Sequence, residues 1–321
     1  MAFVLAEHRF RAMNTGVAAW LWAEPGPADI WLPEVESFFG EVEAELSRFR
    51  PDSGLSRLNA AAGQGPQSVS PMLAEVLQMA LEERERSQGI FDPTILPALR
   101  AAGYDRSFEM LGVAGSRLQL GPFNLQPATC NLQRVAIDFD HLHKTVELPE
   151  GVQIDLGGIA KGWTVDRAAE MLGAWGAALV DAGGDIRATG APGGKPWPLA
   201  VEDPFHPDED LAVTLLAKGA IATSSVLRRN WQLGGRQMHH LIDPRTGRPS
   251  ESELVSVSVL ASTTARAEVA AKVALILGRN ESRTFIERAG LDALLVDRDG
   301  RTEIVGREQP WQWSKRTLAT V

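Results

Sequence analysis

The spacing of apolar residues predicts three helices in this chain of 321 residues. Stretches 34–49, 71–87 and 264–277 each place apolar side chains three and four residues apart, which puts them on one face of a helix. The third stretch ends at Gly278, and glycine commonly ends helices. Residues 25–33 contain several prolines and are expected to form a loop before the first helix.

Alternating and short apolar runs predict β-strands elsewhere. Residues 2–23 are expected to form a hairpin that turns at Asn14-Thr15-Gly16. Residues 211–225 are expected to form a second hairpin, which turns at Lys218-Gly219. Residues 254–262 alternate apolar and polar side chains, as a half-buried strand does.

The order of these elements indicates the fold class. Helices and hairpins follow one another irregularly, which favours an α+β fold over a doubly wound parallel sheet. The chain has no internal repeat and no flexible linker. We therefore expect a single domain of residues 1–321, with a peripheral polar tail from about residue 307.

A glycine-rich stretch, residues 151–190, has the pattern of an anion-binding site. It predicts a strand at 152–156, a glycine turn, a helix that begins near Ala160-Lys161, and a second strand at 177–180. The first-turn amides of a helix and the Lys161 ammonium could face an anion together. The spacing matches neither G-x-G-x-x-G nor G-x-x-x-x-G-K-[ST], and many glycine turns of this kind bind nothing.

Composition narrows the class of protein. The chain has 44% hydrophobic and 23% charged residues, as ordinary globular proteins do. A net charge of −9 disfavours nucleic acid as a partner, because phosphate backbones require clustered Lys and Arg. The single cysteine, Cys130, excludes an internal disulfide framework and suits a reducing compartment. No apolar run has the length of a signal peptide or a membrane span, so a cytoplasmic location without membrane insertion is expected.

Several familiar catalytic motifs are absent from the sequence. It contains no H-E-x-x-H, no G-x-S-x-G and no C-x-x-C, which disfavours zinc proteases, α/β-hydrolases and thiol redox enzymes. His239 and His240 are adjacent, so in a strand they would point to opposite faces and at most one could serve a given pocket. Arg228 and Arg229 could hold phosphate or form a solvated basic pair.

Blocks of sequence along most of the chain resemble one family, the FAD:protein FMN transferases, also called ApbE-like. The blocks occur in the order of that family: MNT at 13–15, SRFRPDSGLSRLN at 47–59, FDPTILPALRAAGYDRSF at 91–108, IDLGGIAKGWTVDR at 154–167, LVDAGGDIRATG at 179–190, IATSS at 221–225 with RR at 228–229, and HLIDPRTGRP at 240–249.

The resemblance implies a compact ApbE-like α+β fold, with mixed or antiparallel sheets flanked by helices around a central FAD cleft. It also implies that the enzyme cuts the FAD pyrophosphate and passes FMN to a Thr or Ser hydroxyl of an acceptor protein. His240 is the candidate for activating that hydroxyl. The positions implied for FAD binding are Met13, Ser53, Asn59, Asp92, Thr94, Asp155, Gly157, Lys161, Gly183, Gly184, Asp185, Ser224, Arg228 and Asp243.

The resemblance also implies a magnesium site, and here the sequence departs from the family. The implied ligands are the Ala160 carbonyl, an Asp that is Glu268 here, and a Thr that is Lys272 here. An ammonium group cannot coordinate magnesium. Glu268 and Lys272 are spaced i,i+4 and could form a helical ion pair. Our hypothesis assigns Lys272 a catalytic role, as a substitute for part of the charge of the metal.

Two smaller departures accompany this one. Asn14 replaces a glycine, and Ser225-Val226-Leu227 replace a more usual Gly-Asp-Tyr. The sequence therefore predicts a transferase whose activity is reduced or independent of metal. Two alternatives remain open: an FAD-binding paralogue that acts as a carrier, sensor or assembly factor, and an FAD pyrophosphate hydrolase.

Overall fold

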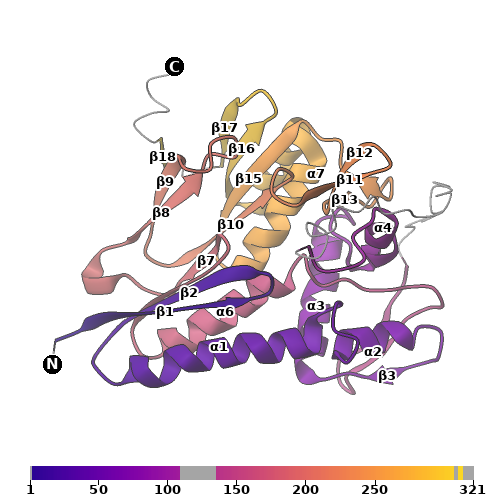
Figure 1. The fold of residues 1–321 in the computed structure, drawn as a ribbon, viewed down its shortest axis with the longest axis horizontal. Coiled ribbons are helices and arrows are strands. Elements are labelled where there is room, and N and C mark those ends of the chain that lie inside the picture. The colour runs from indigo at the N-terminus through magenta and orange to yellow at the C-terminus, as the bar shows by residue number, and fades with distance from the viewer. Residues whose placement is uncertain (1, 109–134, 307–309, 314–321) are drawn as a thin grey trace. The chain divides into compact units, whose positions relative to one another are not determined.

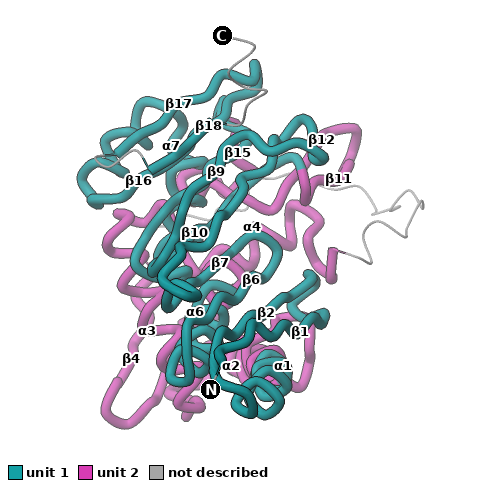
Figure 2. Tube along the Cα trace, turned by 90° about the vertical axis from the view of Figure 1, so that its left-hand side faces the viewer, with its two compact units in different colours: residues 1–40, 161–227, 252–321 teal, residues 41–160, 228–251 magenta. Residues whose placement is uncertain are grey.

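The computed structural model describes residues 2–108, 135–306 and 310–313. Within these ranges the chain forms two compact units. Unit 1 comprises residues 1–40, 161–227 and 252–321, and unit 2 comprises residues 41–160 and 228–251 (Figure 2). The expectation of a single domain stays a prediction. Cys130 lies outside the described residues.

Unit 1 is built on an eight-stranded sheet in which every neighbouring pair is antiparallel (Figure 1). This agrees with the predicted α+β class. In spatial order its strands are β1 Val4–Ala12, β2 Thr15–Ala23, β6 Ala177–Ala182, β7 Asp185–Ala188, β10 Gly219–Ser225, β15 Leu254–Ala261, β16 Asp292–Asp297 and β17 Thr302–Val305.

Both faces of this sheet are covered. The long helices are α1 Pro27–Leu46, α6 Ala160–Gly173 and α7 Thr264–Ala289. Buried side chains of α1 and α6 pack against β2 and β6 in one core, and α7 packs on β10 and β15. A three-stranded sheet of β8 Trp197–Glu202, β9 Asp210–Leu216 and β18 Trp311–Trp313 shares a second core with β7, β10, β15 and β16. A short 3-10 helix, η2 Pro192–Gly194, precedes β8.

Unit 2 combines helices with short strands, and one cluster of its buried side chains includes Leu99, Tyr104 and Ile242. Its helices are α2 Gly54–Ala60, α3 Pro71–Arg86, the 3-10 helix η1 Pro93–Ile95 and α4 Leu96–Ala101. Its strands are β3 Gln67–Ser68, β4 Asp138–Asp140 and β5 Thr145–Glu147 in one sheet, the hairpin β11 Asn230–Leu233 with β12 Arg236–His239, and the pair β13 Ile242–Asp243 with β14 Arg248–Pro249.

The predicted loop at residues 25–33 is wrong, because α1 already begins at Pro27 and contains Pro33. Proline in a helix interior removes a hydrogen bond and costs about 3 kcal/mol. The apolar stripe explains why the helix persists through Pro33, since it starts well before residue 34. Its buried members are Ala28, Leu32, Val35, Phe39, Val42 and Leu46.

Two strand predictions are also wrong. β9 and β10 do not form a hairpin with each other, because β9 pairs with β8 and β18 whereas β10 pairs with β7 and β15. Residues 152–156 do not form a strand, and contacts outside any sheet hold the backbone of Ile154 and Asp155. The side chain of Asn59 accepts from the Ile154 amide at 2.6 Å and donates to its carbonyl at 2.8 Å. The Asp155 amide donates to the Pro93 carbonyl at 2.8 Å.

Two further segments are more buried than their sequences indicate. β15 is buried on both faces along most of its length, and the Ser258 hydroxyl lies 2.7 Å from the Thr223 hydroxyl. The expected peripheral tail includes β18, whose Trp311 side chain is buried in the second core. Polar residues around both segments interrupt the apolar pattern, so the sequence does not indicate that these segments are buried.

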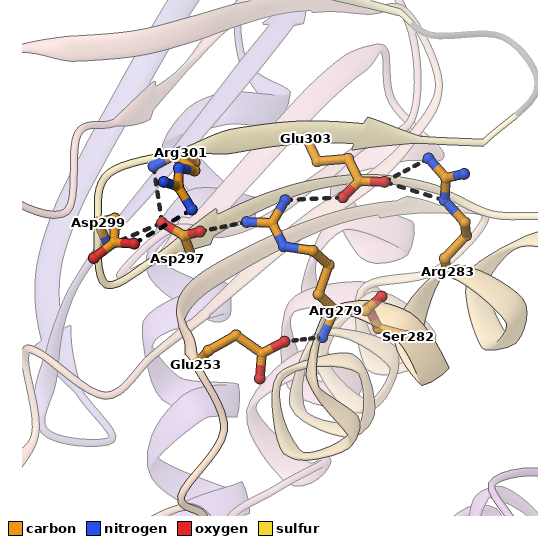
Figure 3. A network of polar contacts seen from close by, with 8 residues as sticks. All are labelled: Glu253, Arg279, Ser282, Arg283, Asp297, Asp299, Arg301 and Glu303. Carbon is orange, nitrogen blue, oxygen red and sulfur yellow. Dashed lines mark hydrogen bonds and ion pairs between the residues drawn. The ribbon is translucent and has the colours of Figure 1, made fainter.

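Gly278 interrupts α7, as predicted, with φ 76° and ψ 172°, but the helix resumes and continues to Ala289. The Glu253 carboxylate accepts from the Arg279 amide at 2.8 Å and so caps the second segment (Figure 3). The Arg279 guanidinium reaches Asp297 at 2.6 Å and Glu303 at 3.1 Å. These contacts join the second segment to β16 and β17.

We predict opposite effects for two Gly→Ala substitutions in long helices. Gly278→Ala would place a Cβ at a positive φ and 3.0 Å from Glu253, so we expect the free energy of unfolding to fall by roughly 1–3 kcal/mol. Gly40→Ala in α1 meets nothing within 4 Å and should raise it by about 0.5–1 kcal/mol. Urea unfolding measures both values, and a stable Gly278→Ala variant would contradict the assignment of strain.

Candidate active site

The N-termini of α6 and α7 lie against each other and exchange caps. The Glu268 carboxylate of α7 accepts from the Gly162 amide of α6 at 2.9 Å. In return, the Asp166 carboxylate of α6 accepts from the amides of Thr264 at 2.7 Å and Ala265 at 3.0 Å. Each carboxylate therefore satisfies helix donors that have no partner within their own helix.

Gly162 permits this close approach. A Cβ at this position would lie 2.7 Å from both the amide nitrogen and the Cα of Ala265. The glycine of the A-K-G motif is thus needed for contact between two helices. This contact also explains how residues far apart in the sequence meet at one site.

Four charged side chains gather beside the paired helix ends: Lys161, Asp185, Glu268 and Lys272, hereafter the charge cluster. The Lys272 ammonium lies 2.8 Å from Glu268 Oε1. The Lys161 ammonium forms an ion pair with Asp185 and donates to the Ala182 carbonyl at 3.2 Å. The ion pair expected between Glu268 and Lys272 is confirmed.

The charge cluster has its carboxylates inside and its ammonium groups outside. The side chains of Asp185 and Glu268 are 3% and 4% exposed, whereas those of Lys161 and Lys272 are 18% and 15% exposed. Burial raises the pKa of Asp185, against the effect of Lys161. Burial also acts to raise the pKa of Glu268, but Lys272, Lys161 and the Gly162 amide outweigh it, so this pKa lies below its ordinary value. Glu268 is therefore ionised at neutral pH.

Two tight turns of unit 1 lie at the same end of the sheet as Lys161. In the turn after β6, Gly183 and Gly184 have φ of 65° and 90°, and the Asp181 carboxylate accepts from the Gly184 amide at 2.8 Å. A Cβ on Gly183 would lie 2.2 Å from Thr15 Oγ1, so only glycine fits there. The register of β2 on β6, with Val17 opposite Ala182, places the two turns side by side.

The turn after β1 shows why Asn14 is acceptable in place of glycine. Met13 and Asn14 have φ of 51° and 57°, as a type I′ hairpin turn requires. Asparagine and glycine both tolerate this region, so the replacement preserves the turn. The turn also lies one residue earlier than predicted. Ser224 is buried on β10.

The predicted FAD-binding residues of unit 2 are mostly engaged in positioning contacts. Ser53 caps α2 by accepting from the Ser56 amide at 2.9 Å. Asp92 Oδ1 accepts from the amide and the hydroxyl of Thr94, both at 2.8 Å, and Asp92 Oδ2 lies 3.1 Å from Arg84 Nε. These contacts, together with those of the Asn59 side chain to Ile154, hold the loops around residues 92–95 and 154–157.

Arg48 is a residue that sequence reasoning missed. Its Nε lies 2.5 Å from Asp155 Oδ2, while Asp155 Oδ1 accepts from the Gly157 amide at 2.9 Å. Its guanidinium carbon lies 4.1 Å from the ring centroid of Phe49 and 4.6 Å from that of Tyr104. Burial raises the pKa of Tyr104, against the effects of Arg229 and Arg48. The motif SRFRPDSG contains Arg48, but nothing in its spacing indicates a partner more than a hundred residues away.

The two histidines have different environments. His239 ends β12, and its Nε2 lies 3.0 Å from the Ser250 carbonyl. His240 follows the strand, is half-buried, and has Nδ1 3.5 Å from the Arg229 carbonyl. If Nδ1 carries the proton toward this carbonyl, Nε2 is left as the basic nitrogen. Arg228 is exposed at the start of the same hairpin.

Asp243 orders the loop that follows His240. Its carboxylate accepts from the Arg245 amide at 2.9 Å, from Arg245 Nε at 3.0 Å and from Nη2 at 2.9 Å. The Asp243 carbonyl also accepts from the Gly247 amide at 2.8 Å. The D-P-R-T-G sequence therefore forms a self-contained turn.

The residues at the implied magnesium position do not fit that ion. Both Glu268 oxygens already bond, one to Lys272 and one to Gly162. Lys272 contributes a positive charge and no lone pair. Across the described ranges, no group of three or more His, Cys, Asp or Glu side chains is arranged to hold a metal ion.

Solved structures with this fold include flavin transferases. The chain matches a structure of flavin transferase ApbE from Vibrio cholerae with a TM-score of 0.77 and 25% identity, which covers 96% of this chain and 98% of that one. An ApbE protein from Thermotoga maritima matches with a TM-score of 0.80 and 24% identity, over 94% and 97% of the two chains. The predicted ApbE-like fold is thereby confirmed.

The sequence model of the ApbE family matches residues 13–295, and the chain belongs to this family. It is 32% identical over 290 residues to a FAD:protein FMN transferase of Treponema pallidum, which covers 84% of this chain and 78% of the relative. A second relative with the same name, from Vibrio cholerae, is 30% identical over 284 residues and covers 85% and 81%. No helix in the part of the chain that the structure describes is long and apolar enough to cross a membrane.

We predict that Gly162→Ala separates the ends of α6 and α7. The added Cβ overlaps the backbone at Ala265, so the free energy of unfolding should fall by about 1–3 kcal/mol. Gly16→Ala is the matched control, because nothing lies within 4 Å of its Cβ. Thermal unfolding of both variants measures the difference, and equal midpoints would show that the helix ends are not in tight contact.

Proposed function

We propose that this chain is a FAD:protein FMN transferase that attaches FMN to a Thr or Ser hydroxyl of an acceptor protein. The observation that carries this proposal is the family match, which spans residues 13–295 and so includes every residue assigned to the site. Curated relatives with this name match over most of the chain. The position of His240 beside an ordered D-P-R-T-G turn supports a role in activating the acceptor.

The reaction breaks the phosphoanhydride bond of FAD and forms a phosphoester bond to the acceptor. The acceptor oxygen attacks the phosphorus of the FMN half of FAD, and the bond from that phosphorus to the bridging oxygen of the pyrophosphate breaks. AMP leaves, and the acceptor hydroxyl loses one proton. His240 Nε2 is the group proposed to take that proton, a role for which a histidine near neutral pH is suited.

The remaining residues are proposed to hold and orient FAD. In unit 1, Lys161 and the Gly183-Gly184 turn offer an ammonium group and an open backbone. In unit 2, the Ser53, Asn59 and Asp92 contacts keep the loops that carry Asp155 and Gly157 in place. Magnesium is assigned no step, because the residues present do not fit it. The cytoplasmic location stays a prediction.

A second candidate function is FAD binding without transfer, in a carrier or sensor. The contacts of Glu268 favour it, since both oxygens of this carboxylate are occupied by Lys272 and Gly162 at the position implied for a metal ligand. Incubation with FAD and an acceptor bearing a flavinylation sequence separates the possibilities. Fluorescence of the acceptor on a gel reports transfer, free FMN with AMP reports hydrolysis, and bound FAD with neither product reports a carrier.

We predict that His240→Ala lowers the transfer rate by about 10²–10⁴-fold, the usual contribution of a general base. The FAD dissociation constant, measured by quenching of flavin fluorescence, should stay within roughly twofold, since the proton transfer belongs to the chemical step. His206→Ala, at an exposed histidine in unit 1, serves as the control. Equal losses of affinity and rate in His240→Ala would assign the residue to binding instead.

A further inference from the structure

The charge cluster contains an ammonium group with unused hydrogen-bonding capacity. Lys272 Nζ has three N–H donors and makes one hydrogen bond to the described residues, to Glu268. Its side chain is 15% exposed, so the remaining donors can reach a ligand at the surface of unit 1. Lys161, with a side chain that is 18% exposed, presents a second ammonium group.

The carboxylates behind these groups fix them in place. Glu268 is bound through one oxygen to Lys272 and through the other to the Gly162 amide, so it holds the ammonium against the end of α6. Asp185 forms an ion pair with Lys161. The charges of Lys161 and Lys272 both act on Asp185 and on Glu268, which shows that the four groups form one electrostatic unit.

We propose that Lys272 is a built-in cation that binds the pyrophosphate of FAD together with Lys161, so that FAD binding by this chain needs no divalent metal. This inference rests on the proposed function for the identity of the ligand. A pyrophosphate diester carries two negative charges, and two ammonium groups match them in number. Lys272 replaces a dissociable ion with a charge that is tethered to α7.

The assignment also explains why Glu268 can be longer than the expected aspartate. A carboxylate that coordinates a metal must leave an oxygen available to the ion. Glu268 instead spans from the Gly162 amide to the Lys272 ammonium, with both contacts below 3 Å. Glu268 and Lys272 therefore form a matched pair. Either Glu268→Asp alone or Lys272→Thr alone should leave the metal site incomplete.

Metal binding to the ligand-free protein is the first test. Titration with Mn²⁺, followed by the electron paramagnetic resonance signal of the free ion, should show no stoichiometric site in the wild type. The double variant Glu268→Asp/Lys272→Thr should gain one site. Lys218→Thr, at an exposed lysine between β9 and β10, should gain none. A wild-type site with an affinity within about threefold of the double variant would overturn the inference.

Binding of FAD is the second test. The wild-type dissociation constant should be the same, within about twofold, in EDTA and in magnesium at matched ionic strength. Lys272→Gln keeps a donor for Glu268 but removes the charge, so FAD affinity should fall about 10–100-fold, the usual loss of a charged hydrogen bond. Lys272→Arg keeps the charge and should stay within about threefold of the wild type. Unchanged affinity in Lys272→Gln would overturn the inference.

The outcomes separate this inference from the proposed function. Metal-independent FAD binding with no transfer to an acceptor would overturn the transferase assignment and support the role of Lys272. If the wild-type protein binds Mn²⁺ and its transfer activity stops in EDTA, the transferase assignment is supported and the role of Lys272 is overturned. A wild-type protein that binds no FAD in either condition would overturn both. Circular dichroism of each variant establishes that loss of binding does not come from unfolding.

Discussion

The exchange of caps between α6 and α7 is the contact on which the site of unit 1 depends. Two buried carboxylates, Asp166 of α6 and Glu268 of α7, each accept from amides at the N-terminus of the other helix. A buried carboxylate is costly unless charged or polar hydrogen-bond partners surround it. Here helix amides supply these partners, and the electrostatics of the helix ends favours negative charge at both positions. The same contact delivers Lys161 and Lys272 to one place.

Both the packing of the two helices and the position of the charged side chains depend on Gly162. Gly162 allows α6 to approach the backbone of Ala265, and its amide is the donor that Glu268 needs. Any larger residue would move the carboxylate and its ammonium partner together. The glycine of the A-K-G motif therefore serves helix packing in the structure, and anion binding by this stretch stays a prediction.

Much of the fold could be predicted because its patterns are local. The stripe of α3, the β1–β2 hairpin and the break at Gly278 all follow from spacing over a few residues. The Glu268–Lys272 pair could be predicted for the same reason, since an i,i+4 spacing brings side chains together on any helix. The remaining site positions come from the family motifs and stay predictions.

The features that were missed depend on contacts between distant segments. The stripe that carries α1 through Pro33 matters only because Leu32 and Val35 meet β2 and β6. Arg48 finds Asp155 and Tyr104 through the fold of unit 2, and no local spacing indicates either partner. β9 pairs in another sheet and not with β10, because its apolar residues pack beside Trp311, which lies near the C-terminal end of the described chain.

The clamp by Asn59 on residues 152–156 has a consequence for the dynamics of the glycine motif. The amide of Ile154 bonds to a side chain and that of Asp155 to the Pro93 carbonyl, so both are protected as strand amides are, without a sheet. Hydrogen exchange at Ile154 then reports opening of the Asn59 contact, and exchange at Asp155 reports opening of the contact to Pro93. The segment that leads into the A-K-G turn is thus held by a latch that can open without any strand leaving its sheet.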